Sequence, residues 1–399
     1  MKRNRIYLIA FITILSFGAG CKKKDMGTPV ASTVSHFEYT LNNQGYAPCD
    51  AVFTNLSLNA TGYLWDFGNG MTSTEANPTT TFTTPGLYNV KLTCTAVNPV
   101  YYNQTVKTLV VNVKDPLAGL TQVLYYTSRG APGNGHMVIL DDNPPLVQDF
   151  VPADISRPYG IAADTAHKKV YITDYSNEAI YMYEADGKDP RKILDANVPG
   201  QEIVGDAQAI FILNDKIYWG RTGGIYKSNL DGTNPEIHID FGSGPPEYPI
   251  DMQYDPATNQ IYFVNDKTDY TGGYWVVNFD GTGLTELIPD VDGTALEMDF
   301  KNNKAYLVLY GSEGTVAPEN GVFMCNPDGS GLTRIGDYGT KATWGITLDD
   351  KRNKLFWSYK ISNSEPDGKI IRANLDGSNP EDWLTGISPH AMTAVWIKL

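Results

Sequence analysis

Short runs in which apolar and polar residues alternate recur along most of the 399-residue chain, and no segment has a sustained helical period. Residues 179–183 (AIYMY) and 369–373 (KIIRA) are two such runs, and each is followed by a glycine-containing turn signal. Alternation with a period of two predicts half-buried β-strands bounded by turns. The pattern therefore predicts an all-β protein.

One turn signal repeats at nearly constant intervals. The clearest copies and one weaker copy are NLDGTNP at 229–235, NFDGTG at 278–283, NPDGSG at 326–331, NLDGSNP at 374–380 and EADGKDP at 184–190. Their aspartates lie 45, 49, 48 and 48 residues apart. A fixed period of this length indicates a repeat architecture. Each Asp-Gly pair predicts a two-residue type I′ hairpin between two strands of one repeat.

Each repeat can be divided into four strands. Five full copies follow one another at 160–194, 208–239, 250–288, 296–335 and 345–384. Residues 122–150 contain three further strands that lack a first strand, and residues 392–399 form one strand that lacks partners. Together these segments complete a sixth unit. We predict a six-bladed β-propeller over 120–399 that the C-terminal strand closes, which leaves only short, protected sheet edges.

The second strands of the repeats carry the motifs YITD at 171–174, YWGR at 218–221, YFVN at 262–265, YLVL at 306–309 and FWSY at 356–359. With the Asp-Gly turns they resemble six-bladed propellers of the low-density-lipoprotein-receptor class B, or YWTD, family. Only 171–174 keeps Thr-Asp, so the resemblance does not extend to the inter-blade hydrogen bonds that the Asp residues make in that family. Propellers of the NHL type are the alternative. The resemblance implies a binding platform without naming a ligand.

A different pattern precedes the propeller. Residues 65–70 read WDFGNG, a Pro-Gly turn stands at 85–86, and 87–94 (LYNVKLTC) is an alternating strand. This order resembles polycystic-kidney-disease (PKD) domains over 34–114, with Asn69 where the family has Asp. The resemblance implies a β-sandwich with Trp65 and Phe67 in its core, acting as a spacer or contact module. Residues 115–119 are the predicted linker to the propeller.

Two cysteines of this first domain fall on the inward side of their strands. Counting by twos places Cys49 with Phe53 and Cys94 with Tyr88. By analogy with immunoglobulin sandwiches, a disulfide between them is one interpretation, and two buried free thiols are the other. The sequence has no CxxC pair, so it indicates neither a thiol redox motif nor a cysteine zinc site.

The N-terminus has the features of an export signal. Three basic residues precede an apolar run that ends in small residues before Cys21, which resembles a bacterial lipobox. We expect residues 1–20 to be the signal peptide, Cys21 to be lipidated and 21–33 to be a tether, which predicts an outer-membrane lipoprotein on the surface or periplasmic face. The formal charge of −14 becomes −17 without residues 1–20, which argues against nucleic acid as a partner.

The loops that enter the innermost strands of a propeller meet at one mouth of the central channel. Aligning these entries predicts a candidate ligand site of Tyr159, Gln208, Asp251, Glu297, Trp344 and His390. Aromatic rings, carboxylates and amides together suit a small polar ligand or a peptide loop. The alternative is that these residues only fill and hydrogen-bond the channel.

Catalytic motifs are absent from the sequence: it has no GxSxG elbow, HExxH helix, P-loop or EF-hand. We therefore predict no catalytic residues and no resident cofactor, and the main hypothesis is a non-catalytic protein that binds a glycan or a cell-surface protein. The enzyme alternative resembles six-bladed lactonases, with Asp251 and Glu297 holding a divalent cation, Ca²⁺ rather than Zn²⁺. A third hypothesis is a purely structural envelope component.

Overall fold

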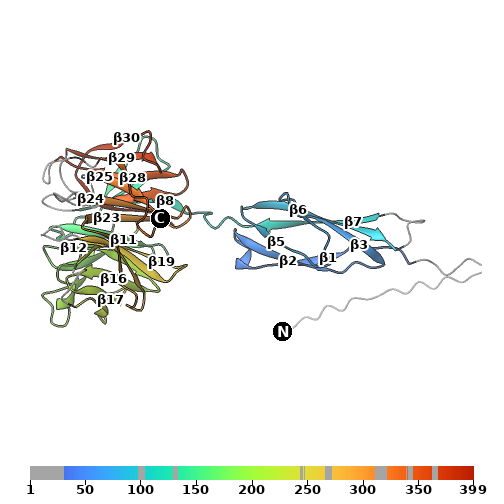
Figure 1. The fold of residues 1–399 in the computed structure, drawn as a ribbon, viewed down its shortest axis with the longest axis horizontal. Helices are drawn as coiled ribbons and strands as arrows, with labels where there is room; N and C mark the ends of the chain where they lie inside the picture. Colours follow the sequence, from blue (N-terminus) through green and yellow to red (C-terminus); the bar gives the residue numbers. More distant parts are fainter. Residues whose placement is uncertain are drawn as a thin grey trace, which may run out of the picture. The chain divides into compact units, whose positions relative to one another are not determined.

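The computed structural model describes residues 31–97, 104–128, 134–242, 246, 248–265, 272–310, 321–337, 339, 345–361 and 367–399. These residues form strands and two short 3-10 turns, η1 (Asn43–Gly45) and η2 (Glu202–Val204), in two compact units, Met1–Ala118 and Gly119–Leu399 (Figure 1). The division falls inside the predicted linker. In the described part of the chain, no helix has the length and apolar character needed to span a membrane.

The first unit is a β-sandwich, as predicted. One sheet has the order β1 (Phe37–Leu41), β2 (Cys49–Asn55), β5 (Thr79–Phe82), and the other has the order β4 (Thr72–Ser73), β3 (Ala60–Asp66), β6 (Gly86–Ala96), β7 (Gln104–Val113). Trp65 and Phe67 are buried between them, and the Trp65 indole donates a hydrogen bond to the Glu75 carbonyl. Gly68 is required because its φ is +74° and the backbone of Asn89 lies 3.2 Å from where a Cβ would stand.

Cys49 and Cys94 both lie in this core, as the alternation indicates. Both are free thiols, so the structure contains the second of the two interpretations and not the disulfide. The Cys94 thiol donates to the Ser57 hydroxyl at 3.2 Å. Burial against aromatic side chains accounts for both positions without a covalent link.

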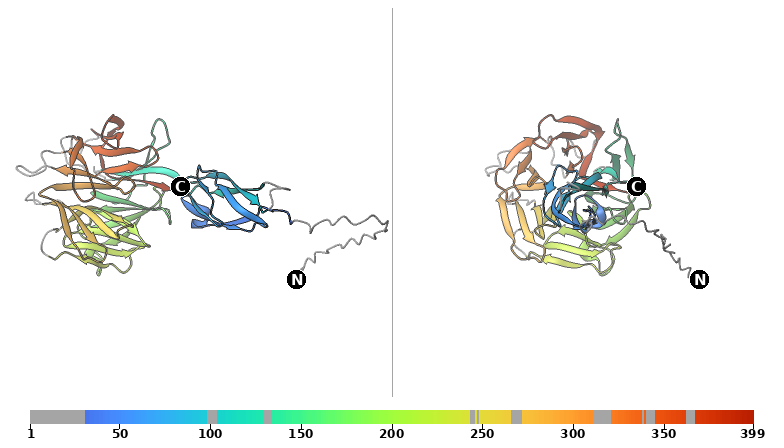
Figure 2. Two further views of the ribbon diagram at one scale, coloured as in Figure 1. Left: turned by 45° about the vertical axis from the view of Figure 1, so that its right-hand side comes forward. Right: turned by 90° about the vertical axis from the view of Figure 1, so that its right-hand side faces the viewer.

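The second unit consists of six four-stranded antiparallel sheets arranged around an axis (Figure 2). From the innermost strand outward, blade 1 has β11 (Pro158–Asp164), β12 (Lys169–Asp174), β13 (Ala179–Glu184) and β14 (Arg191–Asp195), and blade 2 has β15 (Ile210–Leu213), β16 (Lys216–Arg221), β17 (Gly224–Asn229) and β18 (Glu236–Asp240). Blade 3 has β19 (Pro249–Asp255), β20 (Gln260–Asn265), β21 (Gly273–Asn278) and β22 (Thr285–Pro289), and blade 4 has β23 (Asp292–Asp299), β24 (Lys304–Tyr310), β25 (Gly321–Cys325) and β26 (Thr333–Gly336). Blade 5 has β27 (Ile346–Asp349), β28 (Lys354–Tyr359), β29 (Gly368–Asn374) and β30 (Glu381–Ile387). Aromatic side chains of the second strands fill the wedges between blades, Trp219 and Trp357 among them.

The sixth blade joins both ends of the unit, which confirms the predicted closure. Its order is β31 (Pro389–Ile397), β8 (Thr121–Ser128), β9 (Asn134–Ile139), β10 (Val147–Asp149). Within it Val395 lies opposite Val123, and Trp396 lies opposite Gln122. The C-terminal strand is therefore the innermost strand of a sheet whose other strands begin the unit.

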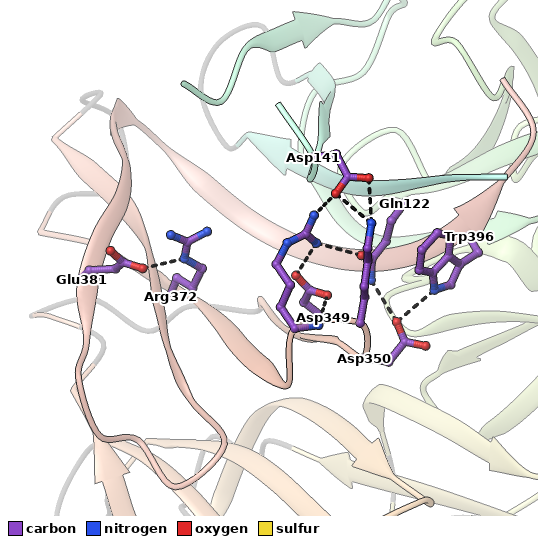
Figure 3. A network of polar contacts seen from close by, with 9 residues as sticks. Gln122, Asp141, Asp349, Asp350, Arg372, Glu381 and Trp396 are labelled. Carbon is purple, nitrogen blue, oxygen red and sulfur yellow. Dashed lines mark hydrogen bonds and ion pairs between the residues drawn. The ribbon is translucent and has the colours of Figure 1, made fainter. Parts of the chain in front are cut away.

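A polar network ties this closing blade to blade 5 (Figure 3). The Gln122 amide donates to Asp350 at 3.0 Å, and the Trp396 indole donates to the same carboxylate at 2.9 Å. Arg352 donates to the Gln122 amide oxygen, to Asp349 and to Asp141. One guanidinium thus joins residues on both sides of the seam.

The Asp-Gly turns are hairpins, but the predicted type I′ geometry is wrong. In the copy at 229–233, the Gly232 N–H donates to the Asn229 carbonyl and the Asn229 N–H donates to the Thr233 carbonyl, each at 2.9 Å. Gly232 has φ +81°, whereas the repeat aspartates are absent from the positive-φ residues of the described chain. This is a type I turn followed by a left-handed glycine. Asp231 instead accepts hydrogen bonds from the Thr233 N–H and hydroxyl.

Replacing Arg352 with Ala should loosen the closure of the ring. The change leaves Asp349, whose side chain is 1% exposed, without its cation, whereas Arg352 itself is 26% exposed. Because that exposure weakens the pair, we expect a loss of about 2 kcal/mol, or a melting temperature lower by ~4–8 °C. Thermal unfolding followed by circular dichroism would measure it.

Arg372→Ala is the matched control, because its ion pair with Glu381 lies within blade 5 and the Glu381 side chain is 52% exposed, whereas that of Asp349 is 1% exposed (Figure 3). It should cost less than about 1 kcal/mol. Equal losses in the two variants would show that the seam network does not stabilise the ring.

Candidate functional site

The innermost strands of all six blades surround a central cavity of about 260 Å³. A second, smaller cavity of about 30 Å³ lies at the entry end of these strands, lined by Tyr159, Ile250, Thr294 and Ala391 among others. The entry end is called the mouth below. The opposite end carries the Asp-Gly turns, because the strands of each blade alternate in direction.

Strand register corrects one part of the predicted ring. Asp251 lies opposite Val264, whereas Glu297 lies opposite Tyr306. The blade 3 equivalent of Glu297 is Gln253, which faces Tyr262, so the aligned entry was wrong by two residues in blade 4. The register shifts of the two first strands fall at equivalent places and each inserts one residue, so the offset arose in the alignment of the repeats and not in the strands.

With this register, the residues at the equivalent position just inside the mouth are small in every blade except blade 3. They are Gly160, Ala209, Asp251, Ala295, Gly345 and Ala391. At Gly160 a Cβ would stand 2.2 Å from the Gln208 carbonyl oxygen of the next blade. At Gly345 it would stand equally close to the His390 carbonyl oxygen, so blades 1 and 5 have no room for a side chain at this position.

Asp251 uses both carboxylate oxygens to bind backbone. Oδ1 accepts the Met252 N–H at 2.9 Å, and Oδ2 accepts the Leu296 N–H of blade 4 at 2.8 Å. Deeper in the channel, Gln253 accepts the Met298 N–H at 3.0 Å and donates to Glu297 at 3.1 Å. These side chains therefore bridge the innermost strands of two neighbouring blades.

Burial raises the pKa of both acids. The pKa of Asp251 rises to about 7 although two backbone N–H groups favour its charged form. The pKa of Glu297 rises to about 8, first because of burial, while hydrogen bonds from Gln253 and Thr347 act in the opposite direction. Removal from water penalises the carboxylate more than these donors stabilise it.

These two acids do not fit a divalent cation. Both oxygens of Asp251 already accept backbone N–H groups, which leaves fewer lone pairs for a metal ion. Among the residues that the structure describes, no group of three or more His, Cys, Asp or Glu side chains is placed to hold a metal ion. The arrangement corresponds to a structural bridge.

Three other predicted residues gather at the mouth. The rings of Tyr159 and His390 meet edge to face at 5.0 Å, and both residues are buried. The Gln208 amide donates to the hydroxyl of Tyr248. Trp344, the remaining predicted member, lies outside the described residues.

The sequence reading missed three residues of this cluster, Arg157, Tyr175 and Tyr248. The Arg157 guanidinium lies 5.1 Å from the ring centre of Tyr159 and 5.0 Å from that of Tyr175, and it donates to the Tyr159 hydroxyl at 2.6 Å. Tyr175 and Tyr248 are half-buried. The cluster thus combines aromatic faces, an amide and one cation.

Blade 1 holds this cluster in place with the Thr-Asp pair that it alone retains. The Thr173 hydroxyl accepts the Gly160 N–H and donates to the Gln208 carbonyl, each at 2.8 Å. Asp174 is fully buried and accepts the N–H groups of Ser156 and Arg157. Both residues therefore fix the loop that carries Arg157 and Tyr159.

One network elsewhere has the connectivity of a catalytic triad. His136 is 2.7 Å from Asp149 through Nδ1 and 2.8 Å from the Ser128 hydroxyl through Nε2. However, the Asp149 side chain is 70% exposed, and Tyr126 is stacked on the imidazole. No cavity described above includes these residues, so the geometry fits a link between the strands of the closing blade.

The comparisons with known proteins agree with the two-part architecture. Residues 28–111 match the PKD domain family. Pre-pro-metalloprotease PrtV, from two strains of Vibrio cholerae, is 62% identical over 37 residues, which are 9% of this chain and 4% of that protein. The chain thus covers a small fraction of the length of these curated relatives, so the match does not assign an activity to it.

Solved propellers resemble the chain at low identity. A chain of the nidogen/laminin complex is 18% identical, with 69% of this chain and 98% of that chain covered and a TM-score of 0.55. TolB from Acinetobacter baumannii is 12% identical, with 78% and 80% covered and a TM-score of 0.50. Likeness at this level shows the propeller fold alone.

The raised acid pKa values predict that stability falls as pH rises. Glu297 holds its proton to about pH 8 when folded but ionises near its ordinary value of 4.5 when unfolded. Between those values the folded state binds more protons, so each such group lowers the free energy of unfolding by at most about 1.4 kcal/mol per pH unit. The melting temperature should therefore be lower at pH 8.5 than at pH 5.

Glu297→Gln should reduce this decline, because the amide has no proton to lose in that range. Glu381→Gln, at an exposed position in blade 5, is the control and should leave the decline unchanged. Melting curves at half-unit pH intervals would measure both slopes. An unchanged slope in Glu297→Gln would mean that Glu297 is ionised in the folded protein.

Proposed function

We propose that this protein is an exported, lipid-anchored, non-catalytic binding protein that recognises a glycan at the propeller mouth, with the PKD domain as spacer. The observation that carries the proposal is the aromatic cluster at the mouth, in which half-buried Tyr175 and Tyr248 surround buried polar groups. Tyrosine faces stack on the apolar faces of sugars, and amide and hydroxyl groups bind sugar hydroxyls.

The direction of the chain supports binding at this end. Thr121, where β8 begins, lies opposite Ile397, whereas Ser128 lies opposite Pro389 at the mouth. The chain therefore enters the propeller at the end that carries the Asp-Gly turns.

The lactonase-type alternative has less support in the channel. It needs Asp251 and Glu297 as metal ligands, but both oxygens of Asp251 accept backbone N–H groups and Oε2 of Glu297 accepts the Gln253 amide. If the role is purely structural, substitutions at the mouth should have no effect on glycan binding. The next experiment separates that role from glycan binding.

A glycan array probed with the full-length protein should give binding that depends on the mouth. Tyr175→Ala and Tyr248→Ala should each weaken it about tenfold, because each removes a stacking face of roughly 1.4 kcal/mol. Phe300→Ala is the control, since this exposed aromatic lies in the β23–β24 turn at the other end. Binding of proteins but no glycan would favour the other partner class, and equal loss in all variants would contradict a site at the mouth.

Changing Cys21 to Ser should release the protein from the membrane fraction. A lipidated N-terminal cysteine carries several acyl chains and anchors stably, whereas the apolar run 6–17 is removed with the signal. Fractionation and metabolic labelling with an alkyne fatty acid would show it. Membrane retention and unchanged labelling of the Ser variant would rule out this anchor.

A further inference from the structure

Arg157 is an unusual cation for this acidic chain. Lys169, Arg191 and Arg352 each pair with a carboxylate, as expected at a formal charge of −14. Arg157 has no ion pair with any residue that the structure describes, and its buried Nε has no hydrogen-bond partner there. Its described hydrogen bond from Nη2 to Tyr159 leaves the hydrogens of Nη1 available.

The acid that binds the backbone of Arg157 does not neutralise this guanidinium. Asp174 directs its oxygens to the backbone N–H groups of Ser156, Arg157, Ser176 and Asn177 and to the Asn177 side-chain amide. It thus fixes the backbone of Arg157 rather than its side chain. Asp206 is the acid beside Tyr248 and has no described contact with Arg157.

Two tyrosine rings hold the guanidinium in a fixed orientation. It lies about 5 Å from the ring centres of both Tyr159 and Tyr175, and cation–π attraction stabilises this placement. A planar guanidinium held in this way is suited to a planar carboxylate, whose two oxygens match its parallel N–H groups. A lysine at the same place would offer charge without this geometry.

We infer that the mouth recognises an acidic sugar, with Arg157 binding the carboxylate of a hexuronic acid and the half-buried Tyr175 ring stacking on its apolar face. This inference rests on the proposed glycan-binding function and narrows its ligand class. The overall negative charge of the chain opposes anionic polymers in general. Binding therefore depends on this one local cation.

The test compares acids with their uncharged counterparts. Oligosaccharides of galacturonate, glucuronate, mannuronate and guluronate, each as free acid and as methyl ester, are titrated calorimetrically into the full lipidated protein in detergent micelles. At least one acid should bind about tenfold more tightly than its ester. Arg157→Gln should reduce the affinity for that acid to the level of the ester and leave affinity for the ester unchanged.

Two further variants test whether the geometry of the guanidinium and its position at the mouth matter for binding. Arg157→Lys should recover only part of the loss, because it retains charge without the bidentate fork. Arg191→Gln, which removes an exposed ion pair at the other end of blade 1, should change nothing. An unchanged melting temperature of Arg157→Gln would confirm that the loss reflects recognition and not folding.

The outcomes separate this inference from the function on which it rests. If neutral glycans bind at the mouth and no acid gains over its ester, the acidic-sugar inference is wrong and glycan binding stands. If Arg157→Gln leaves binding of the preferred acid unchanged, the inference is also wrong. If no glycan binds, charged or neutral, the proposed function itself fails.

Discussion

The innermost strand of every blade is a sheet edge, and this constraint explains most of the channel. Strands β11, β15, β19, β23, β27 and β31 each end the hydrogen-bonding order of their sheet. Backbone groups that face the axis therefore have no strand partner, although they are shielded from bulk water. Side chains of neighbouring blades supply the missing partners: Asp251 binds the Leu296 N–H, Gln253 binds the Met298 N–H, and Thr347 accepts the Ala394 N–H.

The same need explains why acids can be buried here. A carboxyl group that bridges two strands satisfies two donors at once, as Asp251 does, and this compensates part of the cost of burial. Burial still raises its pKa. A pair of acids in a propeller channel is therefore as compatible with a structural bridge between two blades as with a catalytic site. Hydrogen-bond geometry distinguishes the two.

Repetition made the fold predictable from the sequence. A period near 48 residues, and the three strands and one strand left at the two ends, were enough to predict six blades and the pairing of β31 with β8. The geometry of individual turns was harder to predict from the sequence. The hairpin type was wrong because Asp-Gly fits two turn types, and only the φ values separate them.

The candidate site was predictable only in part, for related reasons. Tyr159, Gln208 and His390 follow from the repeat alignment, but Glu297 lies two residues beyond the blade 4 equivalent of Asp251, which separates the two acids along the axis. Tyr175 and Tyr248 lie outside the repeated motifs, so no periodic signal identifies them. Only side-chain contacts bring them to the mouth.

The two ends of the propeller differ in how much their loops vary from blade to blade. At one end the Asp-Gly turns repeat nearly the same hydrogen bonds in blades 2 to 5, so these turns are almost identical in structure. At the mouth the connections differ: two residues join β22 to β23, whereas a segment containing η2 joins β14 to β15. Loops that vary on a rigid scaffold are where binding sites arise. Since the Thr173-Asp174 pair occurs in blade 1 alone, the asymmetry of the mouth is built into one blade, beside Arg157.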